Sequence, residues 1–200
     1  MSIEKQLNIK FPIYWNSWPI EEDFAKYLIN RIITKRPINI VELGSGTSTL
    51  IIVKTLEKLG YKYTLTSIDS DESFLEGTKN LLISEDVFNK NKTKLIFAPI
   101  KDININNINY KWYDLNNINF DFDKIDLLFV DGPVGGFCKN SRYPAIELMK
   151  KYIKEGTTII LHDAKRLDEI EIVKMWKEEN NRIKYVFNIE TERGGAELQF

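Results

Sequence analysis

The sequence predicts an α/β fold: a doubly wound, mostly parallel sheet of seven strands, with helices on both faces and a C-terminal antiparallel hairpin. Strand-like apolar runs alternate with segments whose apolar residues recur at helical spacing, a pattern typical of successive strand and helix units. Five of the six residues at 125–130 are also apolar, as expected of a central parallel strand that is buried on both faces.

A chain of 200 residues suits one domain, and we expect residues 1–200 to form it, with residues 1–18 as an N-terminal arm. The 28 basic and 29 acidic residues nearly cancel, which disfavours nucleic acid or a membrane surface as a partner. A single cysteine, Cys138, excludes an internal disulfide, and a single histidine, His162, excludes a histidine-rich metal site. No apolar run approaches the ~18 residues that span a bilayer, so we expect a cytoplasmic protein. The sequence does not decide between a monomer and a homo-oligomer.

The N-terminal arm is rich in aromatic residues, among them Trp15 and Trp18. They either pack on the domain or form a wall of a substrate pocket. A helix is expected from Pro19, because proline suits the first turn and the acidic residues 21–23 suit the positive end of the helix dipole. Pro37 ends this helix and leads into the first strand.

The strongest local signal lies at residues 38–49. An apolar strand is followed by Gly44-Ser45-Gly46, and a helix with regularly spaced apolar residues then runs to Gly60. Two glycines allow a sharp turn and a close approach of a ligand to the main chain, while the helix N-terminus offers unpaired N–H groups. This combination predicts a nucleotide-type pocket.

Two neighbouring residues narrow the choice of ligand. A dinucleotide-binding turn has a third glycine at the place where this chain has Thr49. Glu42 lies just ahead of the turn, where its carboxylate would repel a pyrophosphate but attract the ammonium group of a methionine moiety. The charge therefore argues against NAD.

Asp69 follows the second expected strand, residues 63–68. In a doubly wound sheet this position lies beside the ligand turn, where a carboxylate accepts hydrogen bonds from ribose hydroxyls. Asp69 comes 25 residues after Gly44, close to the usual spacing of about 20. The alternative is that Asp69 and Asp71 only cap the next helix, expected at residues 73–82. A third strand is expected at residues 94–98.

Residues 101–123 contain seven asparagines, which favour turns over regular elements. We therefore expect a long loop with at most a short helix. Its centre, residues 110–114, is rich in aromatic side chains and includes Trp112. These side chains either stack on an adenine or a substrate ring, or cover the sheet edge.

Two later strands each end in an aspartate. The apolar run at 125–130 leads to Asp131, and the strand at residues 159–161 leads to His162 and Asp163. Because carboxyl ends of parallel strands meet at the edge where such sheets bind ligands, Asp131 is the strongest catalytic candidate. Helices are expected from about residue 142 to Gly156 and around residues 170–176, followed by a hairpin of residues 185–189 and 196–200.

The segment Glu42-Leu43-Gly44-Ser45-Gly46 resembles motif I of the class I S-adenosylmethionine-dependent methyltransferases, whose form is acidic-x-Gly-x-Gly. The segments 98–99, 112–114, 130–133, 142–145 and 162–164 are similar to a bacterial small-molecule subgroup, so the resemblance extends over residues 19–200. It implies a Rossmann-like fold and S-adenosylmethionine as cofactor. The residues expected to bind it are Glu42, Gly44, Ser45 and Gly46 at the methionine part, Asp69 at the ribose, Pro99 near the adenine, and Asp131.

The resemblance also bears on catalysis. Cation-dependent O-methyltransferases of this fold hold a divalent metal with acidic residues at these two strand tips, which Asp131 and Asp163 match. His162 departs from that pattern, because an oxygen ligand is expected at its place. A metal-free alternative makes His162 the general base, oriented by Asp131 or Asp163. In the plainest alternative His162 is structural and Asp163 caps a helix.

The predicted function is methyl transfer to a small-molecule acceptor at a hydroxyl oxygen, with Asp131, His162 and Asp163 as catalytic candidates. Trp112, Arg142 and Tyr143 are the candidate acceptor-binding residues, although Arg142 would equally suit a pairing with neighbouring acidic residues. The alternatives are an NAD-type oxidoreductase and a non-catalytic binding module with the same fold. Nucleic acid as the acceptor is disfavoured.

Overall fold

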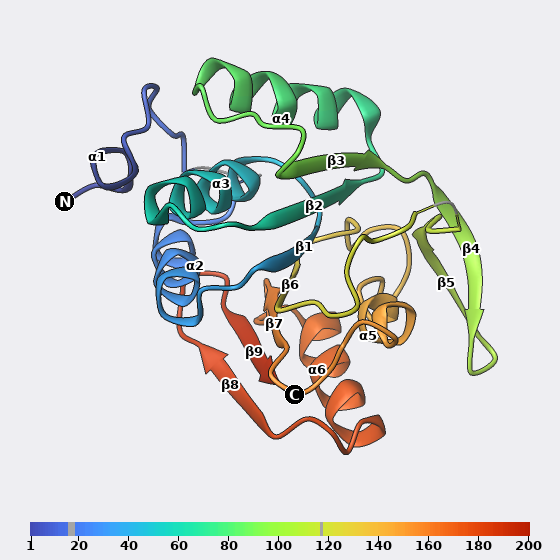
Figure 1. Ribbon diagram of the computed structural model, residues 1–200. Helices are drawn as coiled ribbons and strands as arrows, with labels where there is room; N and C mark the ends of the chain where they lie inside the picture. The colour runs from blue at the N-terminus through green and yellow to red at the C-terminus, as the bar shows by residue number, and fades with distance from the viewer. Residues whose placement is uncertain (16–18, 117) are drawn as a thin grey trace.

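The computed structural model describes residues 1–15, 19–116 and 118–200. The expectation for Trp18 therefore lies outside the described residues. The main feature is a central sheet with helices on both sides of it (Figure 1). No helix of the described chain is long and apolar enough to cross a membrane.

The central sheet has seven strands in the order β3-β2-β1-β6-β7-β9-β8. Neighbouring strands from β3 to β7 are parallel, whereas β9 runs antiparallel between β7 and β8. This arrangement confirms the predicted fold class, including the terminal hairpin. The strands are β1 (Asn39–Leu43), β2 (Thr64–Asp69), β3 (Thr93–Phe97), β6 (Leu127–Val130), β7 (Thr158–His162), β8 (Tyr185–Ile189) and β9 (Gly195–Gln199).

The helices divide the core into two parts. One face of the sheet packs against α2 and α3, and the other packs against α5 and α6 (Figure 1). Each face buries its own cluster of aliphatic and aromatic side chains, as a doubly wound sheet requires. The helices are α1 (Ile3–Leu7), α2 (Glu22–Lys35), α3 (Thr47–Leu59), α4 (Glu72–Ser84), α5 (Pro144–Met149) and α6 (Leu167–Glu179).

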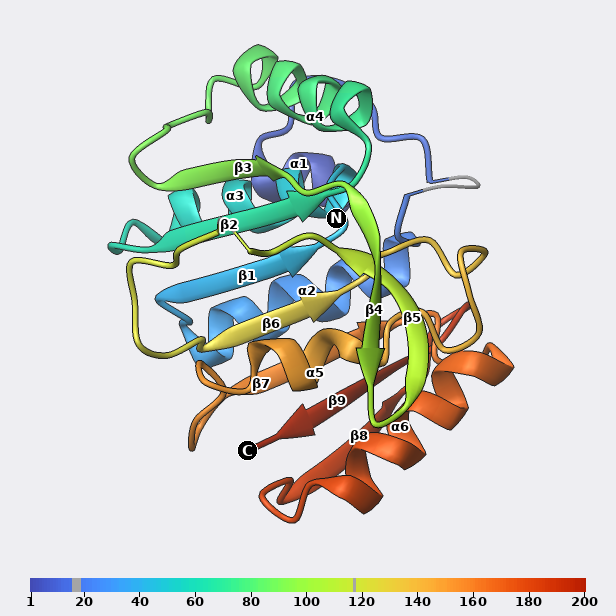
Figure 2. The same cartoon turned by 90° about the vertical axis from the view of Figure 1, so that its right-hand side faces the viewer.

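The expected long loop at residues 101–123 is wrong in its first half. Strands β4 (Ile100–Ile105) and β5 (Ile108–Tyr113) form a separate antiparallel hairpin, which lies on the α5 and α6 side of the sheet (Figure 2). The turn consists of Asn106 and Asn107, both with positive φ, a backbone that suits two-residue hairpin turns and that asparagine tolerates. The asparagines mark the turn, while the alternating apolar residues around them form the strands.

Two smaller differences concern helices. The N-terminal arm begins with α1, which has Ser2 as its N-cap and was not expected because the arm lacks periodicity. Helix α5 ends at Met149 and not at Gly156. Both helices are short, and short helices depend on tertiary packing more than on their own propensity.

Candidate functional site

The carboxyl edge of the sheet brings together the ends of the central strands. In the register of the sheet, Leu43 pairs with Val130, and Val130 pairs with Leu161. The next residues along each strand, Gly44, Asp131 and His162, therefore lie in a row. Figure 2 shows β1, β2, β3 and β6 pointing to this edge.

The glycine turn is shaped by two close backbone approaches. Gly44 has φ of 92°, and a β-carbon there would lie 3.1 Å from the Gly132 nitrogen. A β-carbon on Gly132 would lie 2.1 Å from the Tyr113 hydroxyl, so neither position accepts a larger residue. Gly46, at φ 131°, leads directly into α3. The turn after β1 is thus packed against the turn after β6, which carries Asp131.

Asp69 is bonded to the glycine turn. Its Oδ2 accepts hydrogen bonds from the backbone nitrogen of Ser45 at 2.7 Å and from the Ser45 hydroxyl at 2.8 Å. Its Oδ1 accepts from the backbone nitrogen of Asp71 at 3.0 Å, while Asp71 is the side chain that caps α4. The capping alternative therefore describes Asp71, whereas Asp69 orders the turn itself.

Glu42 lies in the interior beneath the turn and has no exposed surface. Its Oε2 accepts hydrogen bonds from the hydroxyls of Thr49 and Ser67, both at 2.6 Å. Its Oε1 has no hydrogen-bond partner among the residues that the structure describes. Burial raises the pKa of Glu42 to about 7, which the hydroxyl hydrogen bonds only partly offset. The Ser48 side chain is also close enough to lower the pKa of Glu42, so the unmet requirement for a partner is confined to Oε1.

A cavity of about 150 Å³ adjoins this turn. Its volume is below the roughly 300–1,000 Å³ of a typical ligand cleft, so it has room for part of a cofactor only. Among the described residues that line it, Asp131 is the single ionisable one. The lining residues are Pro19, Ile20, Ser45, Thr47, Ser48, Phe74 and Asp131.

His162 lies between two carboxylates. Its Nδ1 is 2.9 Å from Asp131 Oδ1, its Nε2 is 2.8 Å from Glu21 Oε2, and the residue is 1% exposed. Burial by itself lowers the pKa of His162, but the two carboxylates outweigh it and raise the pKa to about 9. The ring is therefore a cation near neutral pH with both nitrogens occupied, so the structure offers no free nitrogen for a general base.

Glu21 is a member of this site that sequence reasoning missed. The sequence predicts Glu21 only as part of an acidic helix start, and in the structure it is the N-cap residue of α2. Burial raises the pKa of its carboxyl, but the hydrogen bonds from His162 and Arg193 outweigh this and lower the pKa to about 2. Because Glu21 and His162 are 141 residues apart, no local pattern signals their contact.

Arg142 is buried beneath the strand tips and 3% exposed. Its guanidinium lies 3.4 Å from Asp131 Oδ1, 3.3 Å from Asp163 Oδ2 and 3.5 Å from Glu169 Oε1. The side chain therefore pairs with the neighbouring acidic residues, as the alternative interpretation of Arg142 stated. It does not face the cavity, and an acceptor would reach it only after rearrangement of the site.

Asp163 is 2% exposed and faces arginines. Arg166 lies 3.0 Å and Arg142 3.3 Å from its Oδ2, and Arg193 lies 3.8 Å from its Oδ1. Glu21, His162 and Asp163 have ligand atoms within 4.8 Å of one another, a spacing that could hold a metal ion. Both nitrogens of His162 are bonded to carboxylates, however, and Glu21 and Asp163 are paired with His162 or with arginines. Neither this group nor the expected pair Asp131 and Asp163 therefore fits a divalent ion as arranged.

The aromatic candidates lie away from the cavity. Trp112 is fully buried in the core on the α5 and α6 side, and Tyr143 stacks on Tyr110 and donates its hydroxyl to Glu179. Pro99, by contrast, is exposed two residues after the end of β3, whose last residue pairs with Asp69. The structure thus brings Glu42, Asp69 and Asp131 to the glycine turn but places Trp112 and Tyr143 in the core.

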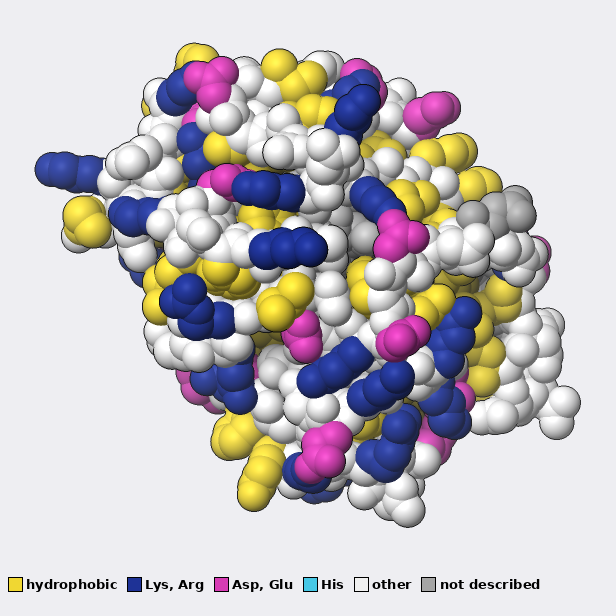
Figure 3. Space-filling view, viewed as in Figure 1, with side chains coloured by type: hydrophobic (Ala, Val, Ile, Leu, Met, Phe, Trp, Pro, Cys, Tyr) yellow, Lys and Arg dark blue, Asp and Glu magenta, His cyan; other side chains and the backbone are white. Residues whose placement is uncertain are grey.

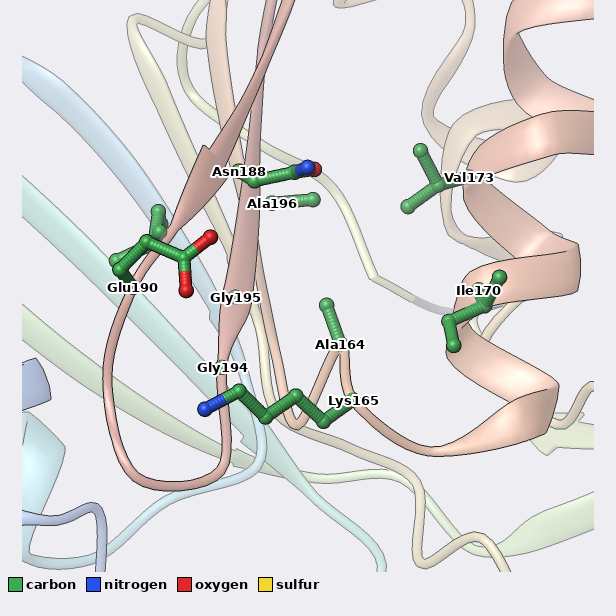
Figure 4. Close-up of a pocket in the computed structure, with 10 residues that line it drawn as sticks. Ala164, Lys165, Ile170, Val173, Asn188, Glu190, Gly194, Gly195 and Ala196 are labelled. Atoms are coloured by element: carbon green, nitrogen blue, oxygen red, sulfur yellow. The ribbon is translucent and has the colours of Figure 1, made fainter.

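A larger cavity of about 400 Å³ lies elsewhere, between α6 and the hairpin of β8 and β9 (Figure 4). It contains none of the predicted site residues. Lys165 in its lining donates to the backbone carbonyls of Thr191 and Glu192.

On the face shown in Figure 3, basic side chains lie among acidic ones, in keeping with the balanced net charge.

The sequence matches a family model described as a methyltransferase domain over residues 41–164. Comparison with curated proteins finds no match. Among solved structures, an O-methyltransferase from Bacillus cereus in complex with SAH has a TM-score of 0.66 at 11% identity, covering 98% of this chain and 96% of that chain. The O-methyltransferase TomG from Streptomyces achromogenes, in complex with SAM, has a TM-score of 0.66 at 12% identity and coverages of 98% and 85%. A methyltransferase from Geobacter sulfurreducens has a TM-score of 0.63 at 15% identity, with coverages of 98% and 83%. At these identities the likeness shows a shared fold.

Proposed function

The chain belongs to the methyltransferase-domain family, and from that premise we propose that it transfers a methyl group from S-adenosylmethionine to a hydroxyl oxygen of a small-molecule acceptor. The family match confirms the resemblance seen in the sequence and sets aside the oxidoreductase alternative. Structures with the same fold include O-methyltransferases in complex with SAH and with SAM, which supports this choice of cofactor and of oxygen as the acceptor atom.

The observation that carries the proposal is the set of acidic groups around the glycine turn. Glu42 has a buried oxygen without a hydrogen-bond partner among the described residues, which suits a cationic ligand such as a methionine ammonium. Glu42 does not line the adjoining cavity, so the ammonium reaches it only when the turn opens. Asp69 lies at the end of β2 with its carboxylate against Ser45, where ribose hydroxyls bind in sheets of this kind. These residues fit S-adenosylmethionine, which supplies an electrophilic methyl group on a sulfonium when it is bound.

Asp131 is the residue best placed to act on the acceptor. Burial raises the pKa of Asp131, but His162 and Arg142 outweigh it and lower the pKa, so the side chain is a carboxylate at neutral pH. His162 and Arg142 both contact Oδ1, which leaves Oδ2 for the acceptor. We assign Asp131 Oδ2 to accept the hydrogen bond of the acceptor hydroxyl and to take its proton during transfer. His162 and Asp163 act through Asp131 and not on the acceptor directly.

The proposal is tested in two steps. Isothermal calorimetry with S-adenosylhomocysteine should show binding to the parent protein, and absence of binding at millimolar ligand would overturn the cofactor assignment. Transfer of radiolabelled methyl from S-adenosylmethionine to a panel of small hydroxylated compounds should then identify an acceptor. Binding without turnover across a broad panel would favour a non-catalytic module over an enzyme.

A further inference from the structure

Arg142 lies between Asp131 and Asp163, the two strand-tip carboxylates that the resemblance gives as candidate metal ligands. Asp131 follows β6 and Asp163 follows β7, and Nη2 of Arg142 lies 3.4 Å from the first carboxylate and 3.3 Å from the second. Nη1 lies 3.5 Å from Glu169. One guanidinium thus contacts the three acidic side chains that would otherwise repel one another.

The guanidinium is also bonded to the backbone of both strand tips. Nη2 donates to the carbonyl of Asp131 at 2.7 Å, and Nη1 donates to the carbonyl of His162 at 3.1 Å. Nε donates to the carbonyl of Pro133 at 3.4 Å. A guanidinium has five N–H donors in a rigid plane and keeps its charge at any physiological pH. Arg142 is therefore a buried cation that is fixed by hydrogen bonds at this edge of the sheet, and it is not a mobile surface side chain.

The remaining cations reinforce this arrangement. Arg166 contacts Asp163 from the surface at 3.0 Å, and Arg193 approaches it from the β8–β9 side at 3.8 Å. A divalent ion binds carboxylate oxygens at about 2.0–2.6 Å, a position that would place it against the guanidinium of Arg142. Expelling a buried arginine from its carboxylates breaks several buried ion pairs at once, which is strongly unfavourable, so the metal competes at a disadvantage.

We propose that Arg142 takes the place of a divalent metal in this protein, holding Asp131 and Asp163 at the strand tips so that the reaction proceeds without a metal ion. The catalytic part of this inference rests on the proposed function. The part that concerns metal binding does not depend on it. Arg142 is in this view a positioning residue, because it is not among the described residues that line the cavity and acts through Asp131. The carboxylates form a latent metal site that is closed by the protein's own guanidinium.

The first test measures metal binding without cofactor or acceptor, so that it is independent of methyl transfer. The metal content of the parent protein is measured as purified; the protein is then dialysed against EDTA, and its thermal unfolding is followed with MgCl₂ and with MnCl₂. We expect less than stoichiometric metal and no rise in Tm with either salt. Stoichiometric Mg²⁺ or Mn²⁺, or a rise of about 5 °C or more at saturating metal, would overturn the proposal.

The second test opens the latent site. Arg142→Ala should be less stable than the parent and should gain a rise in Tm with MnCl₂ that the parent lacks. Arg166→Ala is the matched control, because it removes an exposed guanidinium from Asp163 and leaves Arg142 in place; it should gain no metal response. If Arg142→Ala folds and gains none, the carboxylates are not a latent site and the proposal fails. If Arg142→Ala does not fold, the rise in Tm with MnCl₂ is measured on Arg142→Lys instead. That result and the metal content of the parent then decide the proposal.

The third test concerns turnover. Once an acceptor is known, the kcat of the parent should be equal within twofold in EDTA and in MgCl₂. A loss of tenfold or more in EDTA that Mg²⁺ restores would overturn metal independence. If no acceptor is found, the proposed function is in question, while the metal measurements still decide the role of Arg142.

Discussion

Nδ1 of His162 lies 2.9 Å from Oδ1 of Asp131 across two neighbouring parallel strands, while Nε2 of the same ring lies 2.8 Å from Glu21. The two bonds make the buried imidazole a bridge between the sheet edge and the start of α2. A proton on both nitrogens satisfies both carboxylates at once. His162 therefore keeps Asp131 ionised and oriented toward the cavity, and this relationship underlies the first two predictions.

Asp131→Asn should lower kcat and leave cofactor binding nearly unchanged. The amide keeps the size of the side chain and can still accept from His162, but it cannot take a proton from an acceptor. Loss of a positioned acid or base typically costs about 10²–10⁴ in rate. The check is kcat beside the Kd for S-adenosylhomocysteine, with the exposed Asp121→Asn as control. Turnover within threefold of the parent would remove Asp131 from catalysis.

Stability should fall as pH rises from about 6.5 to 9. The pKa of His162 is about 9 in the folded protein and near 6.5 when unfolded. The stabilisation is thus fully present below pH 6.5 and lost as the pH passes the folded value. The shift corresponds to a loss on the order of 3 kcal/mol. Urea unfolding from pH 6 to 9.5 measures it, and His162→Gln should show a flatter profile; equal slopes in both proteins would contradict the assignment.

Glu42→Gln should separate stability from cofactor binding. Burial raises the pKa of Glu42 to about 7, so the parent loses stability as pH rises from about 4.5 to 7, while the variant escapes this cost of up to about 3 kcal/mol. The glutamine carbonyl can still accept from Thr49 and Ser67. At pH 8 the variant should be at least as stable as the parent but should bind S-adenosylhomocysteine about tenfold more weakly, since it offers no charge to the ammonium. Unchanged affinity would exclude the ammonium contact.

Asp69→Asn should weaken binding of the ribose in particular. Its carboxylate lies at the end of β2 and is oriented by Ser45. Replacing one charged acceptor by an amide should raise the Kd for S-adenosylhomocysteine about tenfold or more. Free adenosine should lose affinity by a similar factor, whereas methionine should not. A variant that binds adenosine as the parent does would show that Asp69 only orders the turn.

Trp112→Phe should change stability and not acceptor binding. The indole is fully buried, and its nitrogen lacks a hydrogen-bond partner among the described residues. The smaller ring leaves a cavity that should cost about 1–3 kcal/mol, partly offset because the unpaired nitrogen is removed. The measurements are the free energy of unfolding and KM for the acceptor. A tenfold rise in KM for the acceptor in a stable variant would show that Trp112 belongs to the acceptor site.

Much of the fold followed from local patterns. The helix α3 begins after the glycine turn and ends at Gly60 as expected, and the apolar run before Asp131 is a central strand. The β4–β5 hairpin differs from the expected loop because two of the asparagines form only its turn and do not break the strands on either side. A period-two pattern around Asn106 and Asn107 was the signal that could have revealed it.

The sequence by itself determined which residues reach the carboxyl edge of the sheet. Strand periodicity and glycine turns are local, so the positions of Glu42, Asp69, Asp131, His162 and Asp163 along the strands could be predicted. Only the tertiary structure decided the charge of these groups and the partners with which they pair. The charge of His162 depends on Glu21, and the closure of the strand tips depends on Arg142, because desolvation and ion pairing are set by atoms that meet only after folding.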